Sequence, residues 1–124
     1  MSEKSILIVD DDRDFSQLLQ IDLAKKGYKV SAAFDGEEGL EKVRQSKPDL
    51  ILLDIKMPKM DGYTFVRRLK KDEATAAIPV IVLTSYEPMK DMFQMEGVKD
   101  YYVKSANTDS LFDTIRQRIQ GTNS

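Results

Sequence analysis

The sequence contains no cysteine and no histidine. Without cysteine there is no disulfide framework, no thiolate nucleophile and no thiolate metal site, which fits a reducing compartment. Without histidine there is no imidazole base, no Ser-His-Asp triad and no zinc site of the usual kinds. Any chemistry must therefore use carboxylates, hydroxyls, lysines and the backbone. The metals that suit such hard ligands are Mg²⁺, Mn²⁺ or Ca²⁺.

Long apolar runs and a strong charge imbalance are also missing. The first apolar run covers only residues 6–9, and no stretch approaches the roughly 18 apolar residues of a membrane span. We therefore expect no signal peptide, no membrane insertion and a cytoplasmic protein. The 19 Lys and Arg against 21 Asp and Glu give a net charge of -2, so we expect no direct nucleic-acid partner.

The length and the apolar content suit one domain. With 124 residues, 41% of them hydrophobic, the chain can bury one core but is short for two domains. We expect a single domain over residues 1–124, with its core at about 4–120 and a short tail at 121–124.

Short apolar runs alternate with amphipathic stretches along the chain. The runs 6–9, 50–53 and 80–83 are uninterrupted and rich in branched residues, which is typical of strands covered on both faces, and 28–33 and 101–103 are weaker strand candidates. Apolar residues at helical spacing between and after them are Phe15, Leu18, Leu19, Leu23, Leu40, Val43, Tyr63, Phe65, Val66, Leu69, Met89, Met92, Phe93, Leu111, Phe112, Ile115 and Ile119. Strict alternation of five strands and five helices predicts an α/β fold with a doubly wound parallel sheet. In the usual flavodoxin-like arrangement the strand order is 2-1-3-4-5.

Capping residues mark the expected helix ends. Asp35 stands three residues before Glu38, which is the spacing of a capping box, and we expect Asp12 and Asp61 to cap helices as well. Further candidates for helix ends are Gly27, Pro88, Gly97, Asn107 and Thr108.

Chemically useful residues follow four of the expected strands. They are Asp10, Asp11 and Asp12 after the first strand, Asp54 after the third, Thr84 and Ser85 after the fourth, and Lys104 after the fifth. Singly, such residues are most often caps, turn residues or solvated lysines. The carboxyl ends of parallel strands meet at one edge, and strands one and three are neighbours, so we expect Asp10, Asp11 and Asp54 to converge.

Three neighbouring carboxylates repel one another, so they either raise their pKa values or recruit a cation. Mg²⁺ suits such a site because it accepts a few carboxylate or carbonyl oxygens and keeps several waters, and Mn²⁺ is a possible substitute. A nearby lysine adds a mobile charge and a threonine adds a hydroxyl donor. Together these groups suggest phosphoryl transfer onto an aspartate.

Four segments of the sequence resemble the receiver domain of two-component response regulators, in the same order and with similar spacing. They are residues 6–12, 52–62, 82–85 and 100–104. The resemblance covers about residues 4–120. It implies that Asp54 is the phosphoacceptor, that Asp11 binds Mg²⁺ directly and that Asp10 binds it through water or helps to position it. The backbone carbonyl of Lys56 is a further implied ligand.

The resemblance also implies a conformational switch. Thr84 and Lys104 would contact the phosphoryl oxygens, and Tyr101 matches the aromatic position that moves inward when the threonine shifts. The face formed by the fourth helix, fifth strand and fifth helix would report the change to a downstream protein. We expect two of the methionines Met89, Met92 and Met95 to be core residues, although methionine also suits adaptable binding surfaces.

A stand-alone receiver is the leading interpretation, and it is a signalling switch rather than an enzyme, limited to its own phosphoryl transfer and slow hydrolysis. Because the chain has no histidine, the phosphohistidine donor must be another protein. That donor would be a sensor histidine kinase or a histidine phosphotransfer protein. The resemblance allows either a monomer or a dimer formed on phosphorylation.

The sequence departs from the family at some positions. A proline, joined by a cis peptide, commonly follows the lysine in the family, whereas Ser105 follows Lys104 here. Lys56 and Tyr86 occupy variable positions beside the entrance for attacking water. We hypothesise that they slow hydrolysis of the phosphoaspartate.

Three alternatives belong to other functional classes. A Mg²⁺-dependent phosphatase with an aspartyl-phosphate intermediate would need a second acid two residues after the nucleophile, where this chain has Lys56. A flavodoxin-like nucleotide binder would need a phosphate loop after the first strand, where aspartates stand instead. A pseudo-receiver that docks without phosphorylation is disfavoured by the complete set of site residues.

Overall fold

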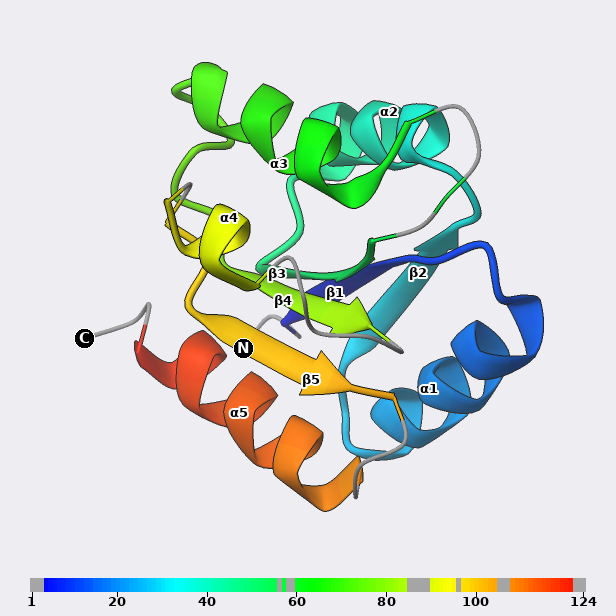
Figure 1. The fold of residues 1–124 in the computed structure, drawn as a ribbon. Coiled ribbons are helices and arrows are strands. Elements are labelled where there is room, and N and C mark those ends of the chain that lie inside the picture. The colour runs from blue at the N-terminus through cyan, green and yellow to red at the C-terminus, as the bar shows by residue number, and fades with distance from the viewer. Residues whose placement is uncertain are drawn as a thin grey trace.

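Five strands and five helices alternate along the chain in the computed structural model, which describes residues 4–55, 57, 60–84, 90–95, 97–104 and 108–121 (Figure 1). The strands are β1 (Ser5–Val9), β2 (Lys29–Ala33), β3 (Leu50–Asp54), β4 (Val80–Thr84) and β5 (Asp100–Val103). The helices are α1 (Arg13–Lys25), α2 (Gly36–Ser46), α3 (Gly62–Lys71), α4 (Lys90–Met95) and α5 (Thr108–Gly121). Every predicted strand is found within one residue of its expected position.

The five strands form one parallel sheet in the order β2-β1-β3-β4-β5. In this register Val9 pairs with Leu53, and Asp54 pairs with Leu83. The ends of β1, β3 and β4 are therefore level. The predicted α/β class, the flavodoxin-like order and the five helices are confirmed.

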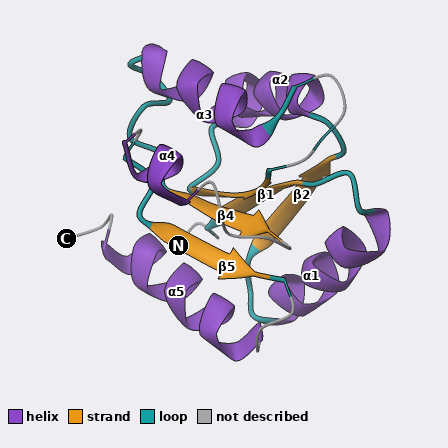
Figure 2. Ribbon diagram, viewed as in Figure 1, coloured by secondary structure: helices purple, strands orange, loops and turns teal. Residues whose placement is uncertain are grey.

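Helices cover both faces of the sheet (Figure 2). Helices α2, α3 and α4 pack on one face, where Leu7 and Val9 of β1 join their buried side chains. Helices α1 and α5 pack on the other face, where Ile6 and Ile8 join theirs. Because successive side chains of a strand point to opposite faces, an uninterrupted apolar run supplies both layers of the core.

Aspartates cap the three helices that follow β1, β2 and β3. Asp12, Asp35 and Asp61 each accept a hydrogen bond from the backbone N–H three residues later, at 3.1, 2.8 and 2.8 Å. The predicted capping roles are confirmed. Each cap fixes the loop that leaves the carboxyl end of a strand, so the loops around that edge of the sheet are held in place.

Glycines with positive φ follow α1 and α4, as predicted for helix ends. Gly27 has φ 97° and Gly97 has φ 89°. Pro88, Met89 and Asn107, for which the sequence predicted roles in helices, lie outside the described residues. Within the part of the chain that is described, no helix is long and apolar enough to cross a membrane.

Candidate functional site

Three carboxylates meet at the carboxyl edge of the sheet. Asp10 and Asp11 follow β1, Asp54 is the last residue of β3, and one oxygen of each lies within 4.8 Å of the others. Asp10 is fully buried and Asp54 is 7% exposed, whereas Asp11 is open to solvent. The cluster therefore combines two buried carboxylates with one that is exposed to solvent.

The electrostatics of the cluster favour a bound cation. Burial, the charge of Asp10 and the smaller contribution of Asp11 raise the pKa of Asp54 to about 7. The charge of Lys104 and a 2.9 Å hydrogen bond from the backbone N–H of Ile55 oppose this rise without cancelling it. Carboxylate oxygens are the ligands that Mg²⁺ and Mn²⁺ prefer, so the residues present fit such an ion.

Lys104 places its ammonium group against two of the carboxylates. Its Nζ lies 2.8 Å from Asp10 Oδ2 and 3.7 Å from Asp54 Oδ1. Burial lowers the pKa of Lys104, but the hydrogen bond and charge of Asp10 and the charges of Asp54 and Asp12 outweigh burial and raise it. The lysine is therefore fully charged at neutral pH.

A closed set of contacts joins the start of α1 to the end of β5. Asp10 Oδ1 accepts from the backbone N–H of Asp12 at 2.9 Å, and Asp12 Oδ1 accepts from that of Phe15 at 3.1 Å. The ring centroid of Phe15 lies 4.7 Å from Lys104 Nζ. The same ammonium group pairs with Asp10, which completes the set. The sequence placed Phe15 only on the apolar face of a helix. The one feature of the sequence that could have indicated its role in the site is that an aromatic residue stands in the first helical turn after the aspartates.

Thr84 and Tyr101 lie on β4 and β5, the two strands that follow β3 in the sheet. Thr84 is buried at the end of β4, and its carbonyl oxygen accepts a 2.7 Å hydrogen bond from the backbone N–H of Lys104. The partly buried ring of Tyr101 meets that of Phe93 on α4 edge to face, with centroids 5.7 Å apart. Tyr102 is buried in the opposite layer, as the alternation of strand residues predicts.

The first residue of α3, Gly62, lies unusually close to the backbone of Asp54. Gly62 donates its backbone N–H to the carbonyl of Ile55 at 2.8 Å. A Cβ atom at position 62 would lie only 2.6 Å from the carbonyl oxygen of Asp54, so this approach requires glycine. The sequence showed Gly62 only as part of a motif after Asp61, and nothing in the pattern revealed the contact.

Several predicted residues lie outside the described part of the chain. They are Lys56, Ser85, Tyr86, Met89 and Ser105, together with the side chain of Met92. Met95 on α4 is described and is 85% exposed.

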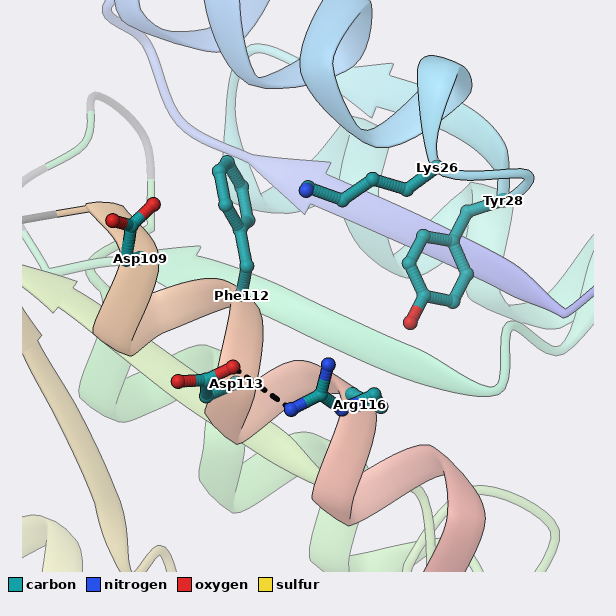
Figure 3. A pocket seen from close by; sticks show the side chains of 6 residues that line it. All are labelled: Lys26, Tyr28, Asp109, Phe112, Asp113 and Arg116. Carbon is teal, nitrogen blue, oxygen red and sulfur yellow. Dashed lines mark hydrogen bonds and ion pairs between the residues drawn. The ribbon is translucent and has the colours of Figure 1, made fainter.

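A separate pocket of about 560 Å³ lies between the C-terminal end of α1 and α5 (Figure 3). It is lined by Lys26, Tyr28, Asp109, Phe112, Asp113 and Arg116, none of which was predicted to belong to the site. Lys26 Nζ lies 4.8 Å from the ring centroid of Phe112, and Arg116 pairs with Asp113 at 2.9 Å. The pocket thus contains a second lysine over a phenylalanine ring, away from the carboxylate cluster.

Two curated relatives match nearly the whole chain. The DNA-binding dual master transcriptional regulator RpaA of Synechocystis sp. is 40% identical over 119 residues, which are 94% of this chain and 49% of RpaA. Protein PilH of Pseudomonas aeruginosa is 38% identical over 118 residues, which are 94% of this chain and 98% of PilH. The chain therefore spans about half the length of RpaA and nearly all of PilH.

A solved structure and a family model give the same assignment. The response regulator protein TrrA of Thermotoga maritima, solved in complex with Mg²⁺-BeF, has a TM-score of 0.84 and 32% identity, covering 93% of this chain and 98% of that one. Residues 6–116 match the family model of the response regulator receiver domain. The chain belongs to the response regulator receiver domain family of two-component signalling.

Proposed function

We propose that this receiver accepts a phosphoryl group on Asp54 from a partner phosphohistidine in a Mg²⁺-dependent reaction, and that phosphorylation switches its α4-β5-α5 face. The observation that carries the proposal is the convergence of Asp10, Asp11 and Asp54 within 4.8 Å, with the Lys104 ammonium within 4 Å of two of them. Such a site combines a nucleophilic carboxylate with positive charge on the side where phosphoryl charge accumulates.

The three carboxylates and the backbone carbonyl of Lys56 would hold the metal ion. Mg²⁺ is the expected ion, and Mn²⁺ could replace it, as the oxygen ligands suit both. When bound, the ion would neutralise the charge of the carboxylates and of the phosphoryl oxygens. Burial first, and the negative charge of Asp10 second, raise the pKa of Asp54, and the positive charge of a bound ion would oppose both effects.

The transfer forms one bond and breaks another. A carboxylate oxygen of Asp54 attacks the phosphorus of the partner's phosphohistidine, the new P–O bond forms and the P–N bond breaks. The imidazole nitrogen keeps the electron pair and takes up a proton. The Lys104 ammonium, 3.7 Å from Asp54 Oδ1, would donate to a phosphoryl oxygen. Attack of water on the same phosphorus later releases phosphate and restores the carboxylate.

The switch would begin at Thr84 and reach the surface through Tyr101. A dianionic group on Asp54 offers charge-assisted hydrogen bonds that a shifted Thr84 hydroxyl can satisfy. The ring of Tyr101 rests on Phe93 of α4, so a change beside β5 is transmitted to that helix. Met95, 85% exposed on α4, supplies an adaptable apolar contact for a downstream protein.

The donor's phosphohistidine lies outside these 124 residues, because they contain no histidine. A sensor histidine kinase or a histidine phosphotransfer protein has the required chemistry. We propose a cytoplasmic location, in keeping with the absence of cysteine, and either a monomer or a dimer that forms on phosphorylation.

Intact-mass measurement after incubation with acetyl phosphate tests the proposal. The wild type should gain one phosphoryl group with Mg²⁺ and none with a chelator, and Asp54→Asn should gain none. Asp22→Asn, which changes an exposed aspartate on α1, should behave as the wild type. An adduct on Asp54→Asn would overturn the assignment of the acceptor. A wild type that binds Mg²⁺ but gains nothing would indicate a docking pseudo-receiver or a need for the cognate donor.

A further inference from the structure

We infer that Phe15 is a positioning residue for Lys104: its ring keeps the lysine ammonium in the site when the carboxylates are occupied. This inference rests on the proposed function, because it assigns Phe15 a part in the same phosphoryl transfer. It concerns a contact between the first turn of α1 and the end of β5.

Among the described residues, two kinds of side chain contact the ammonium of Lys104. Asp10 and Asp54 attract it as anions at 2.8 and 3.7 Å, and the ring of Phe15 attracts it through its quadrupole at 4.7 Å. A divalent cation on the carboxylates would weaken both anionic attractions, because the same oxygens would serve the metal. The attraction to the ring does not depend on those oxygens, so it persists in the charged, metal-loaded site.

The ring of Phe15 is well fixed for this task. Its backbone N–H donates to Asp12 Oδ1 at 3.1 Å, and its partly buried side chain packs against the core between α1, α5 and the sheet. Asp12 is itself tied to Asp10 at 2.9 Å. The position of the ring is therefore set by the segment that supplies the metal-ligating carboxylates.

The pocket between α1 and α5 provides a matched internal comparison (Figure 3). There Lys26 Nζ lies 4.8 Å from the ring centroid of Phe112, almost the same distance as in the Phe15 and Lys104 pair. Phe112 is also partly buried against the same core layer as Phe15. Phe112→Leu therefore removes an equivalent ring contact without touching the site.

The first experiment compares rates of phosphorylation by acetyl phosphate at saturating Mg²⁺ in the whole chain. Phe15→Leu should slow the reaction about 3- to 10-fold, the loss expected for one cation–π contact in a partly buried site. Phe15→Trp should restore at least half of the lost rate, and Phe112→Leu should leave the rate unchanged. Thermal unfolding of each variant sets a temperature at which all are folded. Equal rates for the wild type and Phe15→Leu, or no recovery in Phe15→Trp, would overturn the inference.

The second experiment reads the position of the lysine without any phosphoryl transfer. The ε-methylene protons of Lys104 should show an upfield ring-current shift and a nuclear Overhauser contact with the Phe15 ring, in the wild type, both with chelator and with saturating Mg²⁺. Loss of that contact on adding Mg²⁺ would overturn the inference even if Phe15→Leu failed to fold. A wild type that keeps the contact but takes no phosphoryl group, either from acetyl phosphate or from a phosphohistidine donor, would instead refute the proposed function.

Discussion

The backbone N–H of Lys104 donates to the carbonyl oxygen of Thr84 at 2.7 Å. This hydrogen bond extends the pairing of β4 and β5 by one residue beyond Val103, which faces Thr84 in the register. The main chain of both residues is thereby fixed. The side chain of Thr84 or of Lys104 can therefore be substituted while the pairing of β4 with β5 is kept.

Replacing Lys104 by methionine should tighten Mg²⁺ binding while slowing phosphorylation. The ammonium lies 2.8 Å from Asp10 Oδ2 and competes with a cation for that oxygen. Two unit charges about 4 Å apart interact by roughly 1 to 4 kcal/mol between water and a protein surface, so we expect about 10-fold tighter binding in Lys104→Met. Calorimetric titration with Mg²⁺ measures the affinity.

The control for this variant is Lys26→Met, which removes a lysine from the other ring contact, away from the carboxylates. Its Mg²⁺ affinity should equal that of the wild type. Weaker binding of Mg²⁺ by Lys104→Met would mean that the lysine organises the carboxylates rather than competing for them.

The stability of the chelator-treated protein should fall as pH rises from about 4 to about 7. Asp54 has a pKa of about 7 in the fold against 3.8 as the ordinary value, so between these limits the folded state binds more protons than the unfolded state. A raised carboxyl pKa stabilises the fold at low pH, and this contribution is lost as pH rises through the folded value. At about 1.4 kcal/mol per pH unit, the loss has an upper limit of about 4 kcal/mol.

Urea unfolding of the wild type and Asp54→Asn at pH 5 and pH 8 measures this contribution. With chelator, Asp54→Asn should lose less stability than the wild type between the two pH values. Saturating Mg²⁺ should remove most of the difference, because the ion binds only the folded state and favours the charged carboxylate. Parallel pH dependence of the two proteins with chelator would show that Asp54 does not titrate in this range.

Gly62→Ala should weaken both the fold and the metal site. The added Cβ would lie 2.6 Å from the backbone oxygen of Asp54, and a backbone atom cannot turn aside as a flexible side chain can. We expect a loss of about 1 to 3 kcal/mol in the free energy of unfolding, the usual range for overpacking, together with weaker Mg²⁺ binding. Urea unfolding and Mg²⁺ titration measure the two effects.

Gly27→Ala is the control for Gly62→Ala, because it should destabilise the fold without displacing the metal site. No atom lies within 4 Å of a Cβ at position 27, but φ is 97°, so alanine costs about 1 kcal/mol through backbone strain. This control should lose stability without losing Mg²⁺ affinity. Normal Mg²⁺ affinity in Gly62→Ala would show that the loop adapts without moving Asp54.

The sheet could be predicted from the sequence, because each buried strand is an apolar run between capping or turn residues. Topology then placed Asp10, Asp11 and Asp54 together, since the ends of neighbouring parallel strands are level. The aspartate caps were equally predictable, because a cap depends on residues three positions apart. These features depend on local pattern and on strand order.

Contacts that depend on exact side-chain positions were not predictable. The approach of Phe15 to Lys104 joins the first helix to the last strand, and no local pattern records it. The contact of Gly62 with the Asp54 carbonyl depends on the path of a loop. Whether two of the residues Met89, Met92 and Met95 are core residues stays a prediction, since only Met95 has a described side chain and it is exposed.

Lys47→Gly should stabilise the protein. Lys47 ends α2 with φ 42° and ψ 76°, and it is the one non-glycine residue with positive φ in the described part of the chain. A side chain in this region costs about 1 to 2 kcal/mol, and glycine avoids that cost but adds freedom to the unfolded chain. The expected net gain is about 0.5 to 1 kcal/mol in urea unfolding. The hydrogen bond from its N–H to the Val43 carbonyl stays in place.

Lys25→Gly provides the opposite case for this last prediction. Lys25 is the exposed final residue of α1 and adopts helical backbone angles, so glycine relieves no strain there and should cost up to about 1 kcal/mol. The two variants remove the same charge and the same side chain from the ends of two helices. Opposite signs of the stability change would therefore isolate the backbone as the cause. A loss of stability in both variants would mean that the Lys47 side chain contributes more than its strained backbone costs.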